Sequence, residues 1–241
     1  AVSSWGLPAW AAVLVAMVVC TVLGVIIEGL AYKPLRAATS LAVLITAIGV
    51  SYFLQNSALL IWKAAARVYP PVVEGSMQLF GGKLTVSYVS LLTIAACVVI
   101  MIGLTTFVNK SKMGKAMRAC SEDKAAAQLM GINVNSTISF TFAVGSALAG
   151  IGSVLYCCSY PQATPTMGSM LGLKAFVAAV LGGIGSIPGA MVGGIAIGLC
   201  ECFVSAIGLS AWKDAVTFAI LIIVLLVKPT GFLGRKVQEK V

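Results

Sequence analysis

Glu201 is the residue whose type and position most clearly suggest chemistry, because it is the one carboxylate well inside a long apolar run. A carboxylate is costly to bury in a membrane, so Glu201 should face the protein interior or water, and such residues are candidates for function. Its alternative role is structural, as a neutral or hydrogen-bonded link between two helices. Cys200 and Cys202 flank it but point to different faces of a helix, which predicts no metal site there.

Histidine is absent from the sequence. This removes histidine-based acid–base catalysis, the commonest protein ligand of metal ions and histidine proton relays. The seven cysteines lie mostly inside apolar runs, where they are typical of small buried side chains. Cys157 and Cys158 are adjacent, and a disulfide between neighbours would be strained. We therefore expect neither a catalytic site nor a bound metal, and a membrane-embedded enzyme is disfavoured.

The longest polar interval runs from Lys110 to Asn135, KSKMGKAMRACSEDKAAAQLMGINVN, and carries five basic residues. In its first half, apolar residues recur at the spacing of one helical face, at Met113, Ala116, Met117 and Cys120. Its second half predicts a separate short helix from Glu122 to Met130. The interval is therefore expected to hold two short helices joined by a break.

Start and stop signals bound the second short helix. Ser121 can cap its first turn, where Glu122 and Asp123 suit the positive end of the helix dipole. Gly131 stands where a left-handed residue ends a helix, and Ile132 follows it as a hydrophobic contact.

A helix of about nine residues is marginal alone in water, so it needs a surface to dock on. Small side chains on it would let a partner approach closely, and two large apolar ones would insert into that partner. These are Ala125, Ala126, Ala127, Leu129 and Met130. We therefore expect a docking element within a loop at about residues 109–135.

The composition indicates that a lipid bilayer surrounds most of the chain. Hydrophobic residues make up 60% of it and charged residues 10%, against about 25% charged in an ordinary soluble domain. No soluble core can hide so much apolar side chain, so the bilayer must be the solvent. The net charge of +9 is spread between apolar runs, which favours positive loops of a membrane protein over nucleic-acid binding.

Seven apolar runs are near the length that a bilayer requires. They lie at about residues 9–27, 37–54, 86–108, 137–156, 172–187, 189–207 and 212–227. A polar turn at 28–36 contains Pro34, and Gln55 and Asn56 begin a long connection after the second run. The predicted fold is all-α, a polytopic transmembrane helical bundle of about seven spans in a single domain over residues 1–241.

The Lys and Arg residues set the expected orientation. With the loop at 109–135 inside, eleven of the 16 lie on the inner side, and five lie outside: Lys63, Arg67, Lys83, Lys174 and Lys213. This asymmetry favours seven crossings with a cytoplasmic C-terminus. Trp5 and Trp10 are placed as interface anchors. The chain begins without Met or a basic flank, so we expect that N-terminal segments are missing.

Small residues recur every four positions on the sixth run, at Gly189 and Gly193 and beside them at Ala190, Gly194 and Gly198. Such spacing permits close helix contact in lipid, where packing holds helices together. The preceding turn, GGIGSIPGA, contains Gly182, Gly183, Gly185 and Pro188. Two interpretations remain open: tight packing beside a tight turn, or a flexible part of a translocation path. No Gly-Lys-Ser/Thr follows, so these glycines form no phosphate-binding loop.

Five stretches of the sequence carry a family resemblance: Gly114–Asn133, Lys174–Gly194 (KAFVAAVLGGIGSIPGAMVGG), Leu221–Arg235 (LIIVLLVKPTGFLGR), Tyr32–Arg36 (YKPLR) and Ala47–Asn56 (AIGVSYFLQN). Together they resemble the membrane permeases of branched-chain amino-acid ABC importers, nearest to the H-type of the two unlike permease subunits. The resemblance covers nearly the whole chain, and the glycine-rich block with the PTGFLGR ending is highly specific. It implies a permease domain whose family members continue upstream with further membrane segments.

The resemblance also assigns a role to the docking helix. ABC importer permeases carry a cytoplasmic loop of the form Glu-Ala-Ala-x-x-x-Gly that docks in a groove of the ATPase. Ala126, Ala127 and Gly131 match its later positions, while Ala125 stands where the acid would be and Glu122 lies about one turn earlier. The implied ATPase-coupling residues are Glu122, Asp123, Ala126, Ala127, Leu129, Met130 and Gly131.

The resemblance further implies a complex in the bacterial plasma (inner) membrane. It would contain this subunit, a second related permease subunit, two cytoplasmic ATPase subunits and an external binding protein that delivers leucine, isoleucine or valine. The chain has no phosphate-binding loop and few intramembrane charges. Its energy should therefore come from the ATPase partners, and we expect it to carry no cofactor and to hydrolyse no ATP itself.

Other functions stay open at the level of the sequence. An ABC permease for urea, short amides or other amino acids fits the same residues, because none of them names the substrate. An ion-driven secondary transporter would need several intramembrane polar sites and would work without ATP.

Overall fold

The computed structural model describes residues 9–36, 38–68, 75–79, 84–228 and 230–234. The predictions made for Trp5 and Lys83 lie outside these ranges.

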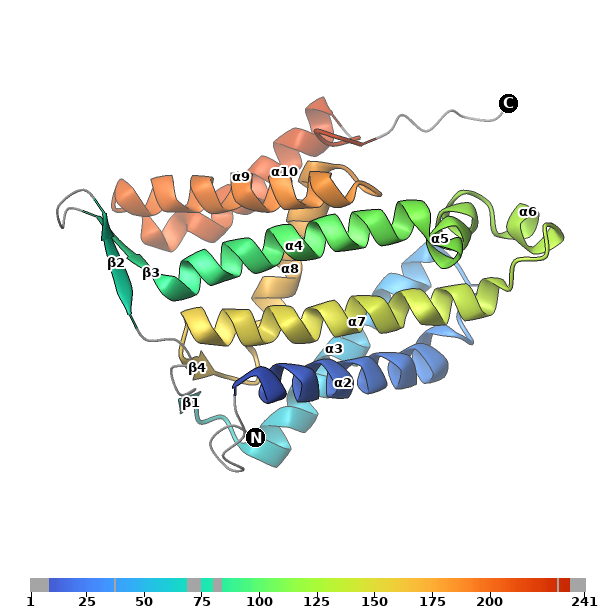
Figure 1. Cartoon of the computed structure of the whole chain (residues 1–241), viewed down its shortest axis with the longest axis horizontal. Helices are drawn as coiled ribbons and strands as arrows, with labels where there is room; N and C mark the ends of the chain where they lie inside the picture. The colour runs from blue at the N-terminus through green and yellow to red at the C-terminus, as the bar shows by residue number, and fades with distance from the viewer. Residues whose placement is uncertain (1–8, 37, 69–74, 80–83, 229, 235–241) are drawn as a thin grey trace. The chain divides into compact units, whose positions relative to one another are not determined.

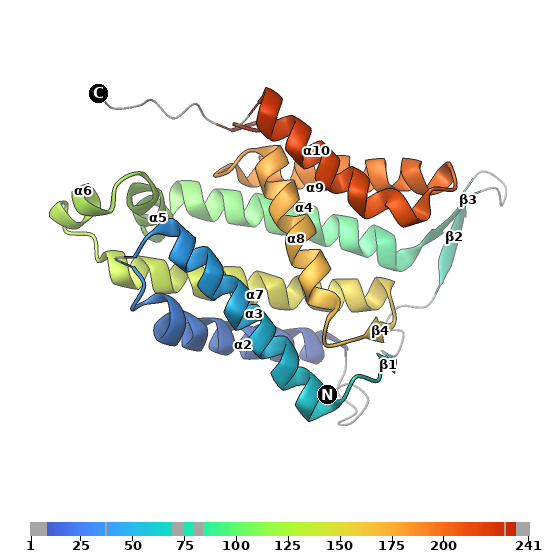
Figure 2. The same cartoon turned by 180° about the vertical axis from the view of Figure 1, so that it is seen from behind.

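The described chain is mostly helical, which confirms the all-α prediction (Figures 1 and 2). Its helices are α2 (Ala9–Ile27), η1 (Glu28–Tyr32), α3 (Ser40–Trp62), α4 (Tyr88–Lys110), α5 (Lys112–Glu122), α6 (Lys124–Leu129), α7 (Val134–Ser159), α8 (Met167–Gly182), α9 (Ile187–Ala206), η2 (Ser210–Trp212) and α10 (Lys213–Val227). Its strands are β1 (Arg67–Val68), β2 (Ser76–Leu79), β3 (Leu84–Ser87) and β4 (Gln162–Ala163). They pair antiparallel, β1 with β4 and β2 with β3.

Within the described residues, six helical segments are long and apolar enough to cross a membrane. They are α2 with η1, α3, α4, α7, α9, and η2 with α10. The seventh predicted run corresponds to α8, a shorter apolar helix of 16 residues. A polytopic all-α architecture is thus confirmed, with six candidate spans and one shorter apolar helix in the described residues. That α8 is the seventh span stays a prediction.

The second segment ends later than the sequence predicts. Gln55 and Asn56 were expected to begin a connection, but α3 continues to Trp62. The amide of Gln55 donates to Ser51 Oγ at 3.1 Å, and the amide of Asn56 donates to Tyr52 O at 2.7 Å. Because each polar side chain is bonded one turn back along its own helix, the two residues do not interrupt α3.

The turn predicted at Glu28–Arg36 also begins later than expected. Its first five residues form the π-helical segment η1, which continues α2. The chain turns only after Tyr32, where Pro34 cannot donate a backbone hydrogen bond. Glu28 is consequently buried at the end of a membrane-spanning segment.

The chain divides into two compact units. Unit 1 contains Ala1–Val99 and Thr106–Thr166, and unit 2 contains Ile100–Thr105 and Met167–Val241. That the whole chain acts as one permease domain stays a prediction.

In unit 1, α2 packs along α7, and Figures 1 and 2 both show the two helices side by side. A Cβ at Gly24 would lie 1.8 Å from Ser146 Oγ, and a Cβ at Gly150 would lie 3.0 Å from Ala16 O. Small residues therefore let the two backbones approach each other, as in other membrane helix pairs.

In unit 2, α8, α9 and α10 pack against one another. Val177 and Leu181 of α8 and Ile197 of α9 form the buried core, and Phe218 and Leu221 of α10 cover it. These apolar side chains fix the face that each helix presents to the other two.

Two glycines of α9 make the close helix contact. A Cβ at Gly193 would lie 2.2 Å from Ala178 O of α8, and a Cβ at Gly189 would lie 2.4 Å from a backbone oxygen of α8. A Cβ at Gly194 would meet only Ala178 Cβ at 3.9 Å, and one at Gly198 would meet nothing within 4 Å. Residues four apart share one face of a helix, so Gly189 and Gly193 lie on the face of α9 that contacts α8. Gly194 and Gly198 lie on the neighbouring face, which makes no such close contact.

The glycine-rich turn joins α8 to α9 tightly. Gly183 and Gly185 have positive φ angles of 105° and 91°, a conformation that other residues rarely adopt. Ser186 caps α9 by accepting the Gly189 N–H at 3.1 Å, and Pro188 lies in the first turn of that helix.

The segment after α10 folds back onto this turn. The N–H of Phe232 donates to Leu181 O, and the N–H of Leu233 donates to the next carbonyl oxygen of α8, both at 2.9 Å. A Cβ at Gly183 would lie 2.3 Å from Gly234 N. The C-terminal ends of α8 and α10 therefore lie at the same end of unit 2.

We expect Gly193→Leu to lower the stability of the folded chain, because several heavy atoms would enter a space already filled by α8. Overpacking of this kind typically costs about 1–3 kcal/mol or more. Gly198→Leu is the matched control on the same helix, since a Cβ there meets open space. The midpoint of thermal unfolding in detergent should fall for the first variant and stay near that of the wild type for the second. Equal midpoints would contradict the close contact.

Candidate functional site

The predicted docking element begins where α5 folds back from α4. Ser111 caps α5, and its Oγ accepts the Gly114 N–H at 2.8 Å. A Cβ at Gly114 would lie 2.4 Å from Val108 O, so only glycine allows the two helices to meet so closely. The predicted apolar face of α5 is directed inward at Cys120, which is buried, and α5 packs on α7.

The second short helix starts later than predicted. Asp123 caps it, because its Oδ1 accepts the N–H groups of Ala125 and Ala126 at 2.8 and 3.1 Å. Ser121 instead donates to Arg118 O within α5. The expected helix from 122 to 130 is therefore wrong at its start: Glu122 ends α5, and α6 runs over Lys124–Leu129. The carboxylate of Asp123, which accepts two N–H groups, is a stronger helix cap than the hydroxyl of Ser121, so α5 ends and α6 begins at Asp123.

The end of α6 is as the sequence predicts. Gly131 has a φ of +82°, and its N–H donates to Gln128 O at 3.0 Å. The N–H of Ile132 reaches back to Ala127 O at 3.1 Å. These two bonds form a Schellman motif, which fixes the direction of the chain as it enters α7.

The faces of α6 differ from the expectation at one position. Leu129 and Met130 are 88% and 83% exposed and remain available to a partner. Ala127 is only 4% exposed, so its side chain faces the protein and not a docking surface. The small-residue face that a partner can approach is therefore limited to Ala125 and Ala126, which are exposed.

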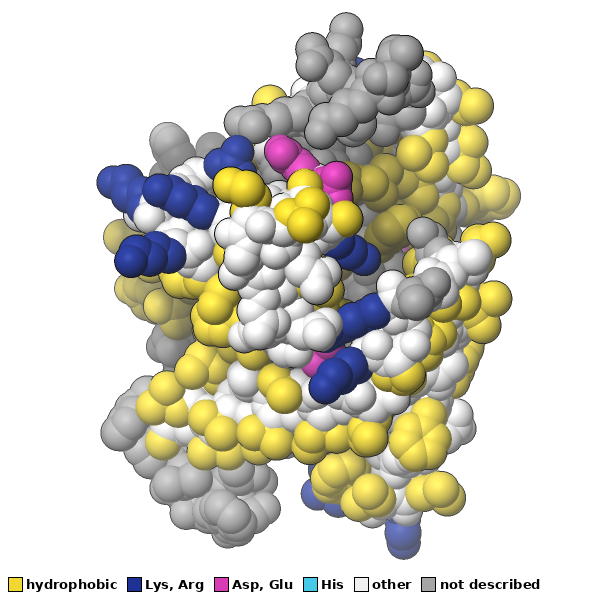
Figure 3. Space-filling view, turned by 90° about the vertical axis from the view of Figure 1, so that its right-hand side faces the viewer, with side chains coloured by type: hydrophobic (Ala, Val, Ile, Leu, Met, Phe, Trp, Pro, Cys, Tyr) yellow, Lys and Arg dark blue, Asp and Glu magenta, His cyan; other side chains and the backbone are white. Residues whose placement is uncertain are grey.

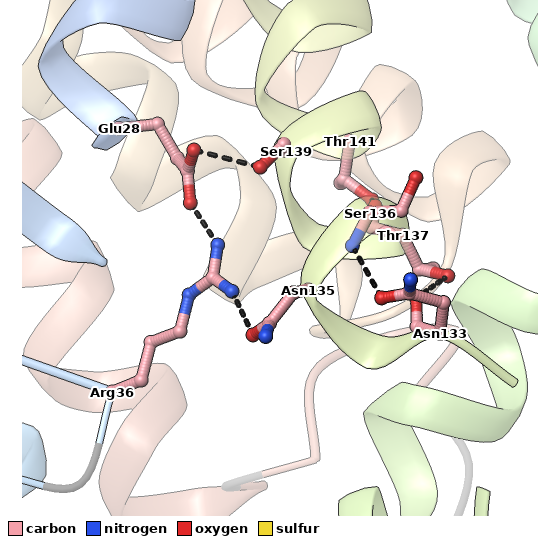
Figure 4. A network of polar contacts seen from close by, with 8 residues as sticks. All are labelled: Glu28, Arg36, Asn133, Asn135, Ser136, Thr137, Ser139 and Thr141. Atoms are coloured by element: carbon pink, nitrogen blue, oxygen red, sulfur yellow. Dashed lines mark hydrogen bonds and ion pairs between the residues drawn. The ribbon is translucent and has the colours of Figure 1, made fainter. Parts of the chain in front are cut away.

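A buried ion pair between Glu28 of η1 and Arg36 of the following loop is hydrogen-bonded to the start of α7 (Figure 4). Glu28 is 2% exposed, and Arg36 donates to its Oε1. Ser139 of α7 donates to Oε2 of the same carboxylate at 2.8 Å. Arg36 also donates to Asn135 of α7. Both carboxylate oxygens are thus bonded, which is the condition for keeping a charge out of water.

The first turn of α7 completes this network. Asn133 caps the helix by accepting the Ser136 N–H at 3.1 Å, and Thr137 Oγ1 donates to Asn133 O at 2.9 Å (Figure 4). The sequence reasoning missed the network, because it assigned Glu28 and Arg36 to a polar turn. A carboxylate directly after an apolar run was a usable signal, but Ser139 is 111 residues away and nothing local points to it.

An open cleft of about 620 Å³ lies beside α6 in unit 1. It is lined by Arg36, Lys124, Ala125, Gln128, Gly131, Ile132, Asn133, Val134, Asn135 and Ile138. Figure 3 looks onto the face of unit 1 that carries α5 and α6, where Lys and Arg side chains gather.

A second polar cluster lies in unit 2 and contains Glu201. Lys174 of α8 places its Nζ 2.9 Å from Glu201 Oε1 and 2.8 Å from Asp214 Oδ1 of α10. Thr217 of α10 donates to Glu201 Oε1 at 3.0 Å. Glu201 therefore links three helices through an ion pair, where the sequence suggested a link between two. The sequence reasoning assigned Lys174 to an outer segment and did not pair it.

Within the described residues, no group of three or more His, Cys, Asp or Glu side chains could hold a metal ion. The predicted site residues fall into two places, with Glu122–Gly131 at the docking element of unit 1 and Gly182–Glu201 in unit 2.

Comparison with known proteins extends over nearly the whole chain. Residues 1–225 match the family described as branched-chain amino acid transport system / permease component. The chain is 43% identical over 235 residues to the high-affinity branched-chain amino acid transport system permease protein BraD of Pseudomonas aeruginosa, covering 96% of this chain and 76% of the relative. It is 44% identical over 241 residues to the permease protein LivH of the same kind of system in Escherichia coli K12, covering 94% and 74%. No solved structure matches it significantly.

We expect Glu201→Gln to retain more function than Glu201→Leu. Glutamine keeps a carbonyl oxygen that can accept from Thr217 and Lys174, whereas leucine removes every polar contact. Solute uptake by the assembled transporter should fall much further in the leucine variant, with the amount of folded chain measured in parallel. Equal uptake by both variants would remove the case for a polar role of Glu201.

Proposed function

Because the chain belongs to the branched-chain amino acid transport system permease family, we propose that it is a membrane subunit of an ATP-driven importer of leucine, isoleucine and valine. The observation that carries this proposal is that the similarity extends over nearly the whole chain and not over one motif. The chain is a multi-pass permease of the inner membrane, and its homologues are transport subunits rather than enzymes.

The proposed complex contains a second related permease subunit, two cytoplasmic ATPase subunits and an external substrate-binding protein. ATP would be bound by the ATPase subunits, and this chain would carry no cofactor. We propose that the C-terminus lies in the cytoplasm. The excess of Lys and Arg in the inner segments supports that orientation.

In the proposed mechanism, α6 docks on the ATPase. A helix of six residues has too little internal hydrogen bonding to persist without support. Its cap at Asp123 and its Schellman end at Gly131 hold it in shape, and Leu129 and Met130 are exposed for insertion into a groove. A few side chains in well-packed pockets that exclude water carry most of the binding energy of a protein interface.

Movement of α6 would reach the membrane through α7 and Glu28. The Schellman motif fixes α6 to the start of α7, and Asn135 and Ser139 of that start are bonded to Arg36 and Glu28. A displacement of α7 therefore either carries the end of α2 with it or breaks the hydrogen bonds from Ser139 to Glu28 and from Arg36 to Asn135, while the Glu28–Arg36 ion pair stays intact. Each hydrogen bond to a charged group contributes about 1.5–3 kcal/mol, which favours the joint movement.

Transport is the direct test of the substrate. Vesicles that contain the full complex, with its binding protein outside and with the ATPase subunits and ATP inside, should accumulate labelled leucine in a saturable, ATP-dependent way. Unlabelled isoleucine and valine should compete, and labelled urea should not accumulate. Urea uptake without leucine uptake would contradict the proposed substrate while leaving the ABC permease intact.

Gly131→Val should uncouple the transporter. Valine pays a backbone penalty of about 1 kcal/mol or more at positive φ and should tilt α6 away from its groove. Gly208→Val is the matched control, because Gly208 has a φ of +88° and, like Gly131, open space around its Cβ position. Substrate-stimulated ATP hydrolysis should be lost in the first variant and kept in the second. Equal activity in both would exclude α6 as the coupling element.

A further inference from the structure

The cleft beside α6 is built from three parts of unit 1 that are far apart in the sequence. One wall is α6, the floor is the turn from Gly131 to Asn133 with the first turns of α7, and the remaining side is Arg36 from the loop after η1. A molecule in the cleft would touch the docking helix and the buried network at once. Its volume of about 620 Å³ has room for several side chains.

The charged residues that line the cleft are Arg36 and Lys124, and both are positive. The polar remainder consists of the amide side chains of Gln128, Asn133 and Asn135, and no carboxylate is among the lining residues. Arg36 is already paired with Glu28, which lies behind the cleft wall. None of the ion pairs within the described part of the chain includes Lys124. The cleft therefore offers one uncompensated cation and several hydrogen-bond donors, which suit a carboxylate.

The position of the cleft indicates what covers it. Lys124 and Gln128 are exposed and belong to the same short helix as Leu129, which is the proposed anchor for the ATPase. A protein that receives Leu129 and Met130 in an apolar groove also comes to lie over the mouth of the cleft. Interfaces of this kind join an apolar anchor to charge pairs at its rim, and the charges set orientation and partner choice.

We propose that the cleft lined by Lys124, Gln128 and Arg36 receives an acidic side chain or short acidic segment of the ATPase partner. This inference rests on the proposed function and adds to it a second contact of stated chemistry. The acid pairs with Lys124 and accepts from the neighbouring amides. It thereby fixes the orientation of α6 on the partner and places a negative charge beside Arg36, the residue that holds Glu28.

The test uses charge reversal in the full transporter complex. Lys124→Glu reverses the cleft charge without harming α6, because an acid in the first turn of a helix is favoured by the helix dipole. Gln128→Glu adds a negative charge and removes no cation. Lys115→Glu on α5 is the matched control, since Lys115 is exposed and does not line the cleft.

The affinity of the ATPase for the permease subunits is measured in detergent at low and high salt. Both cleft variants should weaken the association by about tenfold at low salt and less at high salt, and the control by less than about twofold. In the wild-type complex, carbodiimide should join the Lys124 amine to an ATPase carboxylate, and peptide mass spectrometry identifies the acid. Replacing that acid by lysine should restore the affinity of Lys124→Glu.

Two results would overturn the inference while leaving the proposed function intact. The first is an affinity for the cleft variants equal to that of Lys115→Glu, with no crosslink from Lys124 to the ATPase. The second is unchanged association with the ATPase in detergent, together with leucine uptake that phosphatidylglycerol in the vesicles stimulates for the wild type but not for the cleft variants, which would assign the cleft to a lipid headgroup. Failure of the wild-type chain to associate with any ATPase would overturn the proposed function and this inference with it.

Discussion

Lipid offers no hydrogen bonds, so each polar group within a membrane unit must find its partner inside the protein. In unit 1 this constraint centres on the carboxylate of Glu28, which is held by Arg36 on one oxygen and by Ser139 on the other. The contact joins the end of α2, the loop after it and the first turns of α7. Because α6 is fixed to α7 by the Schellman motif at Gly131, the same contact lies between the docking helix and the membrane spans.

Unit 2 is held together by close backbone contacts and by a second polar cluster. Its three helices are joined at one end by backbone contacts that only glycine allows, where Gly193 meets α8 and Gly183 meets the segment after α10. Further along the same helices, Lys174 holds the carboxylates of Glu201 and Asp214 together. Because two separate sets of contacts join its helices, unit 2 is expected to move as one body. In unit 1, by contrast, Leu129 and Met130 at the end of α6 are exposed.

The sequence predicted those features that depend on neighbours along the chain. Apolar runs of sufficient length gave the spans, and Gly131 was identified as a left-handed helix end because the stop signal is local. The predicted helix boundaries were wrong where a side chain makes a local hydrogen bond that the sequence analysis did not expect, as Gln55 does in α3 and Asp123 does before α6. The polar networks were missed because they join distant residues. Glu28 and Ser139 are 111 positions apart, and only the fold brings Lys174 to Glu201 and Asp214.

The central inference is that the hydrogen bonds of Glu28 and Arg36 to the first turns of α7 transmit the movement of the docking helix to the membrane spans. It is tested most directly by measuring ATP hydrolysis and leucine uptake in the same vesicles for the double variant Glu28→Gln/Arg36→Gln, which removes both charges and leaves neither one buried alone. We expect hydrolysis to continue while the amount of leucine transported per ATP falls severalfold. Wild-type uptake per ATP in a folded, assembled double variant would contradict it.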